Sequence, residues 1–329
     1  MKFLFIIFLC FSLKLFAQTP QLGFEDWAQP ELVTAARGLS MGNAYISKVD
    51  DAYSAFYNPA GLGSIRDPSL HLFNLHFETN KNMLDLAFGG NLADNADQIL
   101  NYFSPDGMRT LLNKPENRGQ LLHNRFNAFP NFTTRYFTLG YFMSKQLRAY
   151  VPFDSSFPLE LADRFDHGPV LSTNISMWGG VFKVGSSIAY VNRSEHLGTH
   201  DITMPIDLND TNTKKGGATI ITAGAKLTLP IYALPTFSAV LRNAANQKFS
   251  SARGAGAPDQ IRQSTDLGFS LTPQIGKFTR VHFEFNWRDV GNKYNKIFER
   301  RAMGGMEIDF ARKFYIRAGY GDGYGAGDG

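Results

Sequence analysis

Residues 279–288 read Thr-Arg-Val-His-Phe-Glu-Phe-Asn-Trp-Arg, so polar side chains alternate with mostly apolar ones along the whole stretch. Successive side chains of a strand face opposite sides of a sheet, so this stretch predicts a β-strand with one apolar and one polar face. Val281, Phe283, Phe285 and Trp287 form the apolar row. In a soluble sheet such a row meets a protein core, whereas in an outer-membrane barrel it meets lipid and the polar row lines a wet lumen.

The same alternation recurs through the second half of the chain. Further apolar rows of this kind begin at Phe137, Leu171, Phe182, Ile221, Phe237, Leu267, Ala302 and Phe314. With two weaker segments, at 69–78 and 121–132, the pattern predicts about eleven strands. Several of them approach the roughly 9–11 residues that a tilted transmembrane strand needs.

The predicted connections are alternately short and long. The short ones fall near 133–135, 179–180, 230–235, 273–276 and 311–313. The long ones cover roughly 79–120, 147–158, 193–217, 244–262 and 290–297. Outer-membrane barrels have short periplasmic turns and long external loops, so the alternation favours an all-β, antiparallel transmembrane β-barrel. A secreted β-sandwich is the alternative, because such domains also cluster some of their loops at one end.

The first residues have the features of an exported protein. Lys2 precedes an apolar run that starts at Phe3, and Ala17 precedes the polar Gln18. This pattern predicts a signal peptide over residues 1–17, although Lys14 interrupts its apolar part. The single cysteine, Cys10, lies within it, so the mature chain cannot rely on disulfides. Twenty-nine Phe, thirteen Tyr and three Trp residues suit the aromatic girdles of a membrane barrel.

The longest connection contains short helical patterns. Asp94 can cap a helix that places Ile99 and Phe103 on one face. Met108, Leu111 and Leu112 predict a second amphipathic piece. We interpret residues 82–88 as a helix as well, because a strand there would reverse the alternation of loops.

A compact segment precedes the first strand. It reads ARGLSMGNAYISKVDDAYSAFYNPAGL over residues 36–62 and predicts a capped short helix over 50–57 followed by a sharp bend at Asn58-Pro59-Ala60-Gly61. This stretch resembles the N-terminal segment of outer-membrane proteins of the FadL/OMPP1 superfamily, including its PorV-like branch. In that family a hatch lies inside a barrel of fourteen strands. The resemblance implies a hatch over residues 18–66, with Asn58, Pro59, Ala60 and Gly61 in the lumen, and a barrel over 67–329. The alternative is that these four residues only end the helix and form a turn.

The resemblance also implies a function. It predicts a non-enzymatic protein of the Gram-negative outer membrane that passively transports hydrophobic small molecules such as long-chain fatty acids. An apolar pocket between hatch and barrel would bind the tail, and inner arginines would meet the carboxylate. The alternative, from the PorV-like branch, is a barrel that anchors or shuttles secreted proteins at the cell surface.

An odd number of strands conflicts with a closed bacterial barrel, whose strand count is even. The family resemblance predicts that about three closing strands are missing after the glycine-rich residues 319–329. A twelve-stranded barrel containing one unrecognised strand is the alternative.

The polar rows of the last three strands are the candidate lumen-facing residues. They are Arg280, His282, Glu284, Asn286, Arg288, Arg301, Glu307, Asp309 and Arg317. Opposite charges on neighbouring strands can pair with one another, and selection of a charged head group is the second interpretation.

Other sites receive little support. His196 and His200, with Glu195 and Asp201, offer ligands for a metal, but a site needs three or four at fixed geometry. Residues 207–212 lack the central glycine and closing glutamate of a calcium loop. No catalytic constellation lies at local spacing, and the 33 basic residues are scattered rather than arranged in a stripe, which argues against nucleic-acid binding. We therefore predict no metal, cofactor or nucleic-acid partner.

Overall fold

The protein is mostly β, as the alternation predicts. The computed structural model describes residues 32–88, 101, 103–153, 158–291 and 301–321. Fifteen strands form one antiparallel sheet, accompanied by a few short helices. The strands are β1 (Ser69–His71), β2 (Leu75–Thr79), β3 (Leu122–Ala128), β4 (Asn131–Thr133), β5 (Phe137–Tyr150), β6 (Leu159–Met177), β7 (Phe182–His200), β8 (Lys214–Thr228), β9 (Thr236–Arg242), β10 (Ser250–Gly254), β11 (Ser264–Leu271), β12 (Gln274–Ile275), β13 (Thr279–Trp287), β14 (Ala302–Phe310) and β15 (Phe314–Gly321).

The strands follow the chain across the sheet. The main path of eleven strands runs β1-β4-β5-β6-β7-β8-β9-β11-β13-β14-β15. Beside it, β3 pairs with β5, as β4 does, and β2 pairs with β3. Pro130 lies between β3 and β4, where its missing N–H suits an interruption of the ladder. Among the strands described, none joins β15 to β1 or β2.

The predicted alternation of connections is confirmed, but several long connections are shorter than predicted. Strand β5 continues to Tyr150, β7 continues to His200, β8 begins at Lys214, and residues 250–254 form β10 inside the predicted connection 244–262. Short turns occupy 134–136, 178–181, 229–235, 272–278 and 311–313. The strands β6 and β7 have 19 residues each, so residues 193–200, predicted as loop, continue β7. The apolar alternation is absent there because charged side chains form ion pairs between β6 and β7. Arg193 Nε donates to Asp166 at 2.7 Å and Arg164 Nε donates to Glu195 at 3.0 Å.

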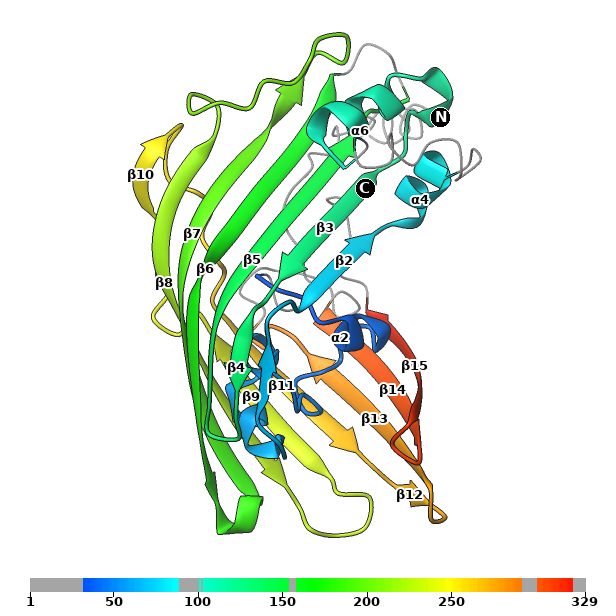
Figure 1. Ribbon diagram of the computed structural model, residues 1–329, viewed down its shortest axis with the longest axis vertical. Helices are drawn as coiled ribbons and strands as arrows, with labels where there is room; N and C mark the ends of the chain where they lie inside the picture. Colours follow the sequence, from blue (N-terminus) through cyan, green and yellow to red (C-terminus); the bar gives the residue numbers. More distant parts are fainter. Residues whose placement is uncertain (1–31, 89–100, 102, 154–157, 292–300, 322–329) are drawn as a thin grey trace, which may run out of the picture.

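Two short helices cover the end of the sheet where the long connections lie (Figure 1). They are α4 (Lys81–Phe88), close to its predicted range, and α6 (Pro105–Leu112). Ser104 Oγ caps α6 by accepting from Gly107 N at 3.0 Å. The predicted face of Met108, Leu111 and Leu112 is buried. The predicted signal peptide and the helix starting at Asp94 fall outside the residues described.

Residues 32–66, hereafter the N-terminal segment, lie in the space around which the sheet curves (Figure 1). Its helices are α2 (Ala36–Ser40), α3 (Ser54–Tyr57) and the 3-10 helix η1 (Pro59–Ser64). The predicted helix over 50–57 is thus shorter, and no side chain caps it. Met41, Tyr45 and Ile46 are fully buried and belong to a cluster that includes Phe142 and Val191 of the sheet. The main core therefore lies on the inner, concave face.

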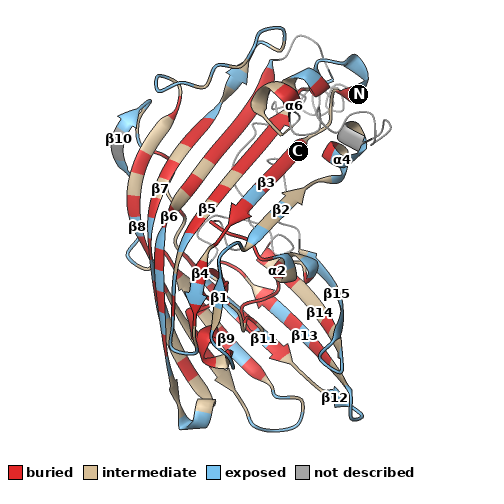
Figure 2. Ribbon diagram, in the orientation of Figure 1, coloured by how far each residue is buried: buried red, intermediate tan, exposed pale blue. Residues whose placement is uncertain are grey.

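Burial across the sheet is the reverse of that in a soluble protein. Phe283 and Phe285 are 46% and 44% exposed, whereas Glu284 and Asn286 between and beside them are 4% and 3% exposed. The same alternation of exposed and buried residues marks the neighbouring strands (Figure 2). The polar rows predicted to share one face do so, and that face is the inner one. No helix within the described part of the chain is long and apolar enough to cross a membrane.

Candidate functional site between the N-terminal segment and the sheet

Six glycines of the inner face allow the N-terminal segment to approach the sheet backbone. A Cβ atom added to any of them would lie 2.0–2.6 Å from the segment, far inside van der Waals contact. We call these residues the wall glycines; they are Gly185, Gly224, Gly268, Gly305, Gly319 and Gly321. Sequence reasoning missed them, although glycine inside a strand is a signal for close backbone approach.

The predicted hatch motif lies against two of these glycines. Pro59 covers Gly185 and Asn58 covers Gly224. Asn58 is fully buried; its Nδ2 donates to Ile46 O at 2.9 Å and its Oδ1 accepts from Ala60 N at 3.1 Å. Gly61 lies so close to Val49 O that a Cβ atom would be 2.6 Å away. The motif Asn58-Pro59-Ala60-Gly61 therefore shapes the segment and fits it to the sheet.

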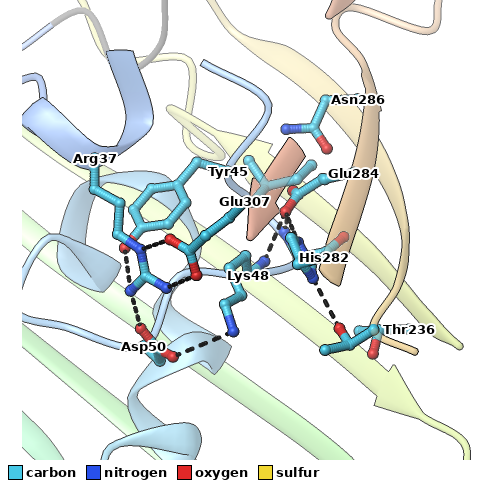
Figure 3. Close-up of polar contacts among 12 residues, drawn as sticks. Arg37, Tyr45, Lys48, Asp50, Thr236, His282, Glu284, Asn286 and Glu307 are labelled. Atoms are coloured by element: carbon cyan, nitrogen blue, oxygen red, sulfur yellow. Dashed lines mark hydrogen bonds and ion pairs between the residues drawn. The ribbon is translucent and has the colours of Figure 1, made fainter. Parts of the chain in front are cut away.

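Glu284 of β13 binds the backbone of the N-terminal segment. Its carboxylate accepts from Lys48 N at 2.9 Å (Figure 3). It also accepts from Ser47 N at 2.6 Å. His282 lies 3.1 Å from the same carboxylate. Such charge-assisted hydrogen bonds are about twice as strong as neutral ones. Glu284 is thus a buried anchor rather than a free lumenal charge.

Glu307 of β14 forms the second anchor. Arg37 Nε and Nη2 each donate to one of its oxygens at 2.8 Å (Figure 3). Arg317 Nε donates to the same carboxylate at 2.7 Å. Arg37 Nη1 also donates to Asp50 at 2.6 Å. Burial lowers the pKa of Arg37, but Tyr45, Glu307 and Asp50 together outweigh it and raise that pKa. The guanidinium is therefore a permanent bidentate link between segment and sheet.

Asp51 is the buried carboxyl of the segment itself. It accepts from the Tyr45 hydroxyl at 2.8 Å and from Tyr53 N at 2.9 Å. Burial first, and then the neighbouring Asp50, raise the pKa of Asp51. Its contacts stay within the segment, so it supports the local fold and does not contact the sheet.

The remaining predicted inner residues divide into three locations. With its amide turned so that oxygen faces the segment, Asn286 accepts from Tyr45 N at 2.8 Å. Arg288 and Arg301 are buried at the other end of β13 and β14, where Arg301 Nη1 donates to Asp289 O at 3.0 Å. The other three, Arg280, Asp309 and Arg317, line a cavity.

That cavity has a volume of about 560 Å³ and lies between the N-terminal segment and the sheet edge near the short turns. Its lining is mainly charged, in contrast to the apolar pocket predicted from the sequence. Three of its arginines make no side-chain hydrogen bond or ion pair with any described residue; they are Arg66, Arg280 and Arg312. The same lining holds five carboxyl groups, those of Asp50, Asp51, Asp67, Glu307 and Asp309, so an anionic group would have to lie beside these three arginines.

The two candidate metal ligands lie on strand β7 rather than in a loop. His196 Nε2 is 2.8 Å from His200 Nε2, and His196 Nδ1 is 2.7 Å from Asn212 O. Over the residues that the structure describes, no group of three His, Cys, Asp or Glu side chains could hold a metal ion. The two rings pair with each other.

No known protein family, curated protein or solved structure matches the chain.

Proposed function

We propose that this chain is an integral protein of the Gram-negative outer membrane, with the outer face of its sheet in lipid and the N-terminal segment inside. The reversed burial carries this proposal. Exposed Phe283 and Phe285 flank buried Glu284, and an exposed apolar face of this extent in water would be an interaction or aggregation surface. In lipid the same face is favourable.

Aromatic side chains at the short turns support the same placement. Each of the five short turns contains or adjoins an exposed aromatic residue. They are Tyr136, Trp178, Tyr232, Phe278 and Phe314. Aromatic rings are enriched at membrane–water interfaces, where one end meets hydrocarbon and the other water. The turns would then mark the periplasmic boundary of the membrane.

A membrane location requires that the sheet close. Unpaired backbone groups at the edges β2 and β15 would each cost several kcal/mol in hydrocarbon. Closure into a β-barrel around the N-terminal segment is therefore part of the proposal.

The activity we propose is passive transport of a hydrophobic small molecule with an anionic head, such as a long-chain fatty acid. The cavity of about 560 Å³ supports it, since Arg66, Arg280 and Arg312 are available to a carboxylate. The cavity suits the head group, so the tail would contact other surfaces.

A second function is favoured by the firm attachment of the N-terminal segment. Backbone bonds to Glu284 and the bidentate Arg37–Glu307 pair hold it in place. A barrel closed by a fixed segment suits a protein that anchors or shuttles secreted partners, as in the PorV-like branch.

Phe283→Lys tests the membrane location. Phe283 is central in β13, so in lipid vesicles the change is expected to lower the free energy of unfolding by about 2–4 kcal/mol. Tyr232→Lys, in an exposed short turn, should cost about 1 kcal/mol or less. Denaturant titration measures both. If both changes stay within about 0.5 kcal/mol, as expected for an exposed position in water, the outer face does not contact lipid.

Deleting the gene separates the two functions. Loss of labelled long-chain fatty acid uptake, restored by the intact gene, is expected if the protein is a transporter. Unchanged uptake combined with altered protein composition at the cell surface would instead support the anchoring function.

A further inference from the structure

Two buried lysines converge on one hydroxyl group of the N-terminal segment. Lys183 of β7 and Lys226 of β8 are directly opposite each other in the sheet. Lys183 Nζ donates to Ser64 Oγ at 3.0 Å and Lys226 Nζ donates to the same oxygen at 3.3 Å. Only 9% of Lys183 and 6% of Lys226 is exposed. Neither lysine belongs to the predicted polar rows or to the two carboxylate anchors.

No carboxylate contacts this pair directly. Within the described part of the chain, neither lysine lies within 4.0 Å of a carboxylate oxygen; Asp50 and Glu284 act on them only from a longer distance, and Ser64 is their shared partner. Two ammonium groups so close together repel each other, and burial increases the repulsion because the local dielectric constant is low, so protonation of both lysines is unfavourable while no anion is bound. An anion beside them would favour the doubly protonated pair.

Ser64 connects the lysine pair with the charged cavity. Its side chain is one of the groups that line the cavity. A serine oxygen can accept two hydrogen bonds and donate one. Both acceptor positions are directed to the lysines, so the remaining O–H is available to donate. Arg66 and Arg280, which have no partner among described residues, line the same cavity.

We propose that the cavity binds a doubly charged oxyanion, inorganic phosphate or a phosphate monoester, at Ser64. The Ser64 hydroxyl donates to a phosphate oxygen. Lys183 and Lys226 lie on the other side of Ser64 and stabilise the anion through their charges. A phosphate group carries a charge of about −1.5 to −2 at neutral pH, which matches two ammonium groups better than a single carboxylate does. The site shares its cavity with the head-group position proposed above, but phosphate binding at Ser64 does not require transport.

Calorimetry on the purified full chain in a phosphate-free maltoside detergent tests the site. The probes are inorganic phosphate, decyl phosphate and decanoate. We expect saturable binding of one phosphate group per chain, with decanoate at least about tenfold weaker. Similar affinities for phosphate and decyl phosphate identify the free anion as sufficient, whereas tighter decyl phosphate identifies an amphiphile as the source; both results support the site.

Variants then locate the binding. Lys226→Met and Lys183→Met are each expected to weaken decyl phosphate binding at least about tenfold. Lys277→Met, in an exposed turn, should bind like the parent. Ser64→Ala removes a single hydroxyl group and should weaken binding about fivefold. It serves as the test if the lysine variants fail to fold.

Several results would overturn the proposal. These are absence of saturable phosphate binding by the parent, equal binding of decanoate and decyl phosphate, or unchanged affinity in Ser64→Ala or in a folded lysine variant. Because binding is measured on the isolated protein, a negative result leaves the uptake experiment unaffected.

Discussion

Gly305→Val is expected to detach the N-terminal segment from the sheet, whereas Gly304→Val should leave it in place. The two glycines are neighbours on β14 but face opposite sides. A Cβ atom on Gly305 would lie 2.6 Å from Met41 O, while one on Gly304 would meet nothing within 4 Å. Valine favours strands, so the sheet itself tolerates both changes. The difference between the variants isolates the contact with the segment.

The expected cost of Gly305→Val is large because the clash involves backbone. Met41 O cannot rotate away as a side chain can, so the segment must shift or dissociate. Overpacking of this kind costs typically 1–3 kcal/mol, and we expect about 3 kcal/mol here. That free energy corresponds to an increase of about 100-fold in the open population of the segment.

Trypsin cleavage after Lys48 measures this opening. In the folded protein Lys48 N is bonded to Glu284 and the segment is packed against the sheet. When opening is fast relative to cleavage, the cleavage rate follows the open population. Gly305→Val should therefore be cut at this bond about 100 times faster than the parent or Gly304→Val. Equal rates for the two valine variants would contradict the role of the wall glycines.

Arg37→Gln is expected to release the second anchor. It removes the bidentate contact with Glu307 and the bond to Asp50 together. Breaking a buried ion pair commonly costs about 3–5 kcal/mol because the partner charge is left behind. Arg37 is partly exposed and Arg317 still contacts Glu307, so we expect a smaller cost, about 2–3 kcal/mol.

Arg317→Gln provides the matched control. Arg317 contacts the same carboxylate at 2.7 Å, but it belongs to β15, so its loss weakens a contact between strands and leaves the segment attached. Only Arg37→Gln should therefore accelerate cleavage after Lys48, by about 30- to 100-fold. In the double variant Arg37→Gln/Glu307→Gln the added effect should be small, because the two residues act as one pair. Equal acceleration by both single arginine variants would show that the pair does not hold the segment.

Local sequence patterns predicted much of the sheet. Alternation over 279–288 gave one strand and one polar face, and the polar residues Glu284 and Asn286 do lie on the inner face. The pattern failed at residues 193–200, where ladder bonds and ion pairs continue the strand without apolar alternation. Alternation of apolar and polar residues identifies a strand only where one of its faces is apolar. It cannot identify a strand whose two faces are both polar.

The candidate site was predictable only in part. Glu284 and Glu307 belong to the predicted polar rows, but their partners Lys48 and Arg37 were not identified. Nor were Lys183 and Lys226, which converge on Ser64. The Arg37–Glu307 pair spans 270 residues, and such a distance leaves no trace in local periodicity.

Side-chain alternation and turn length are local properties of the sequence. They were therefore enough to predict most of the strands, their antiparallel order and the polar side of each strand. The wall glycines that admit the N-terminal segment and the buried lysine pair at Ser64 depend on which distant segments pack together. Packing is a property of the whole chain, so these features became visible only in the folded protein.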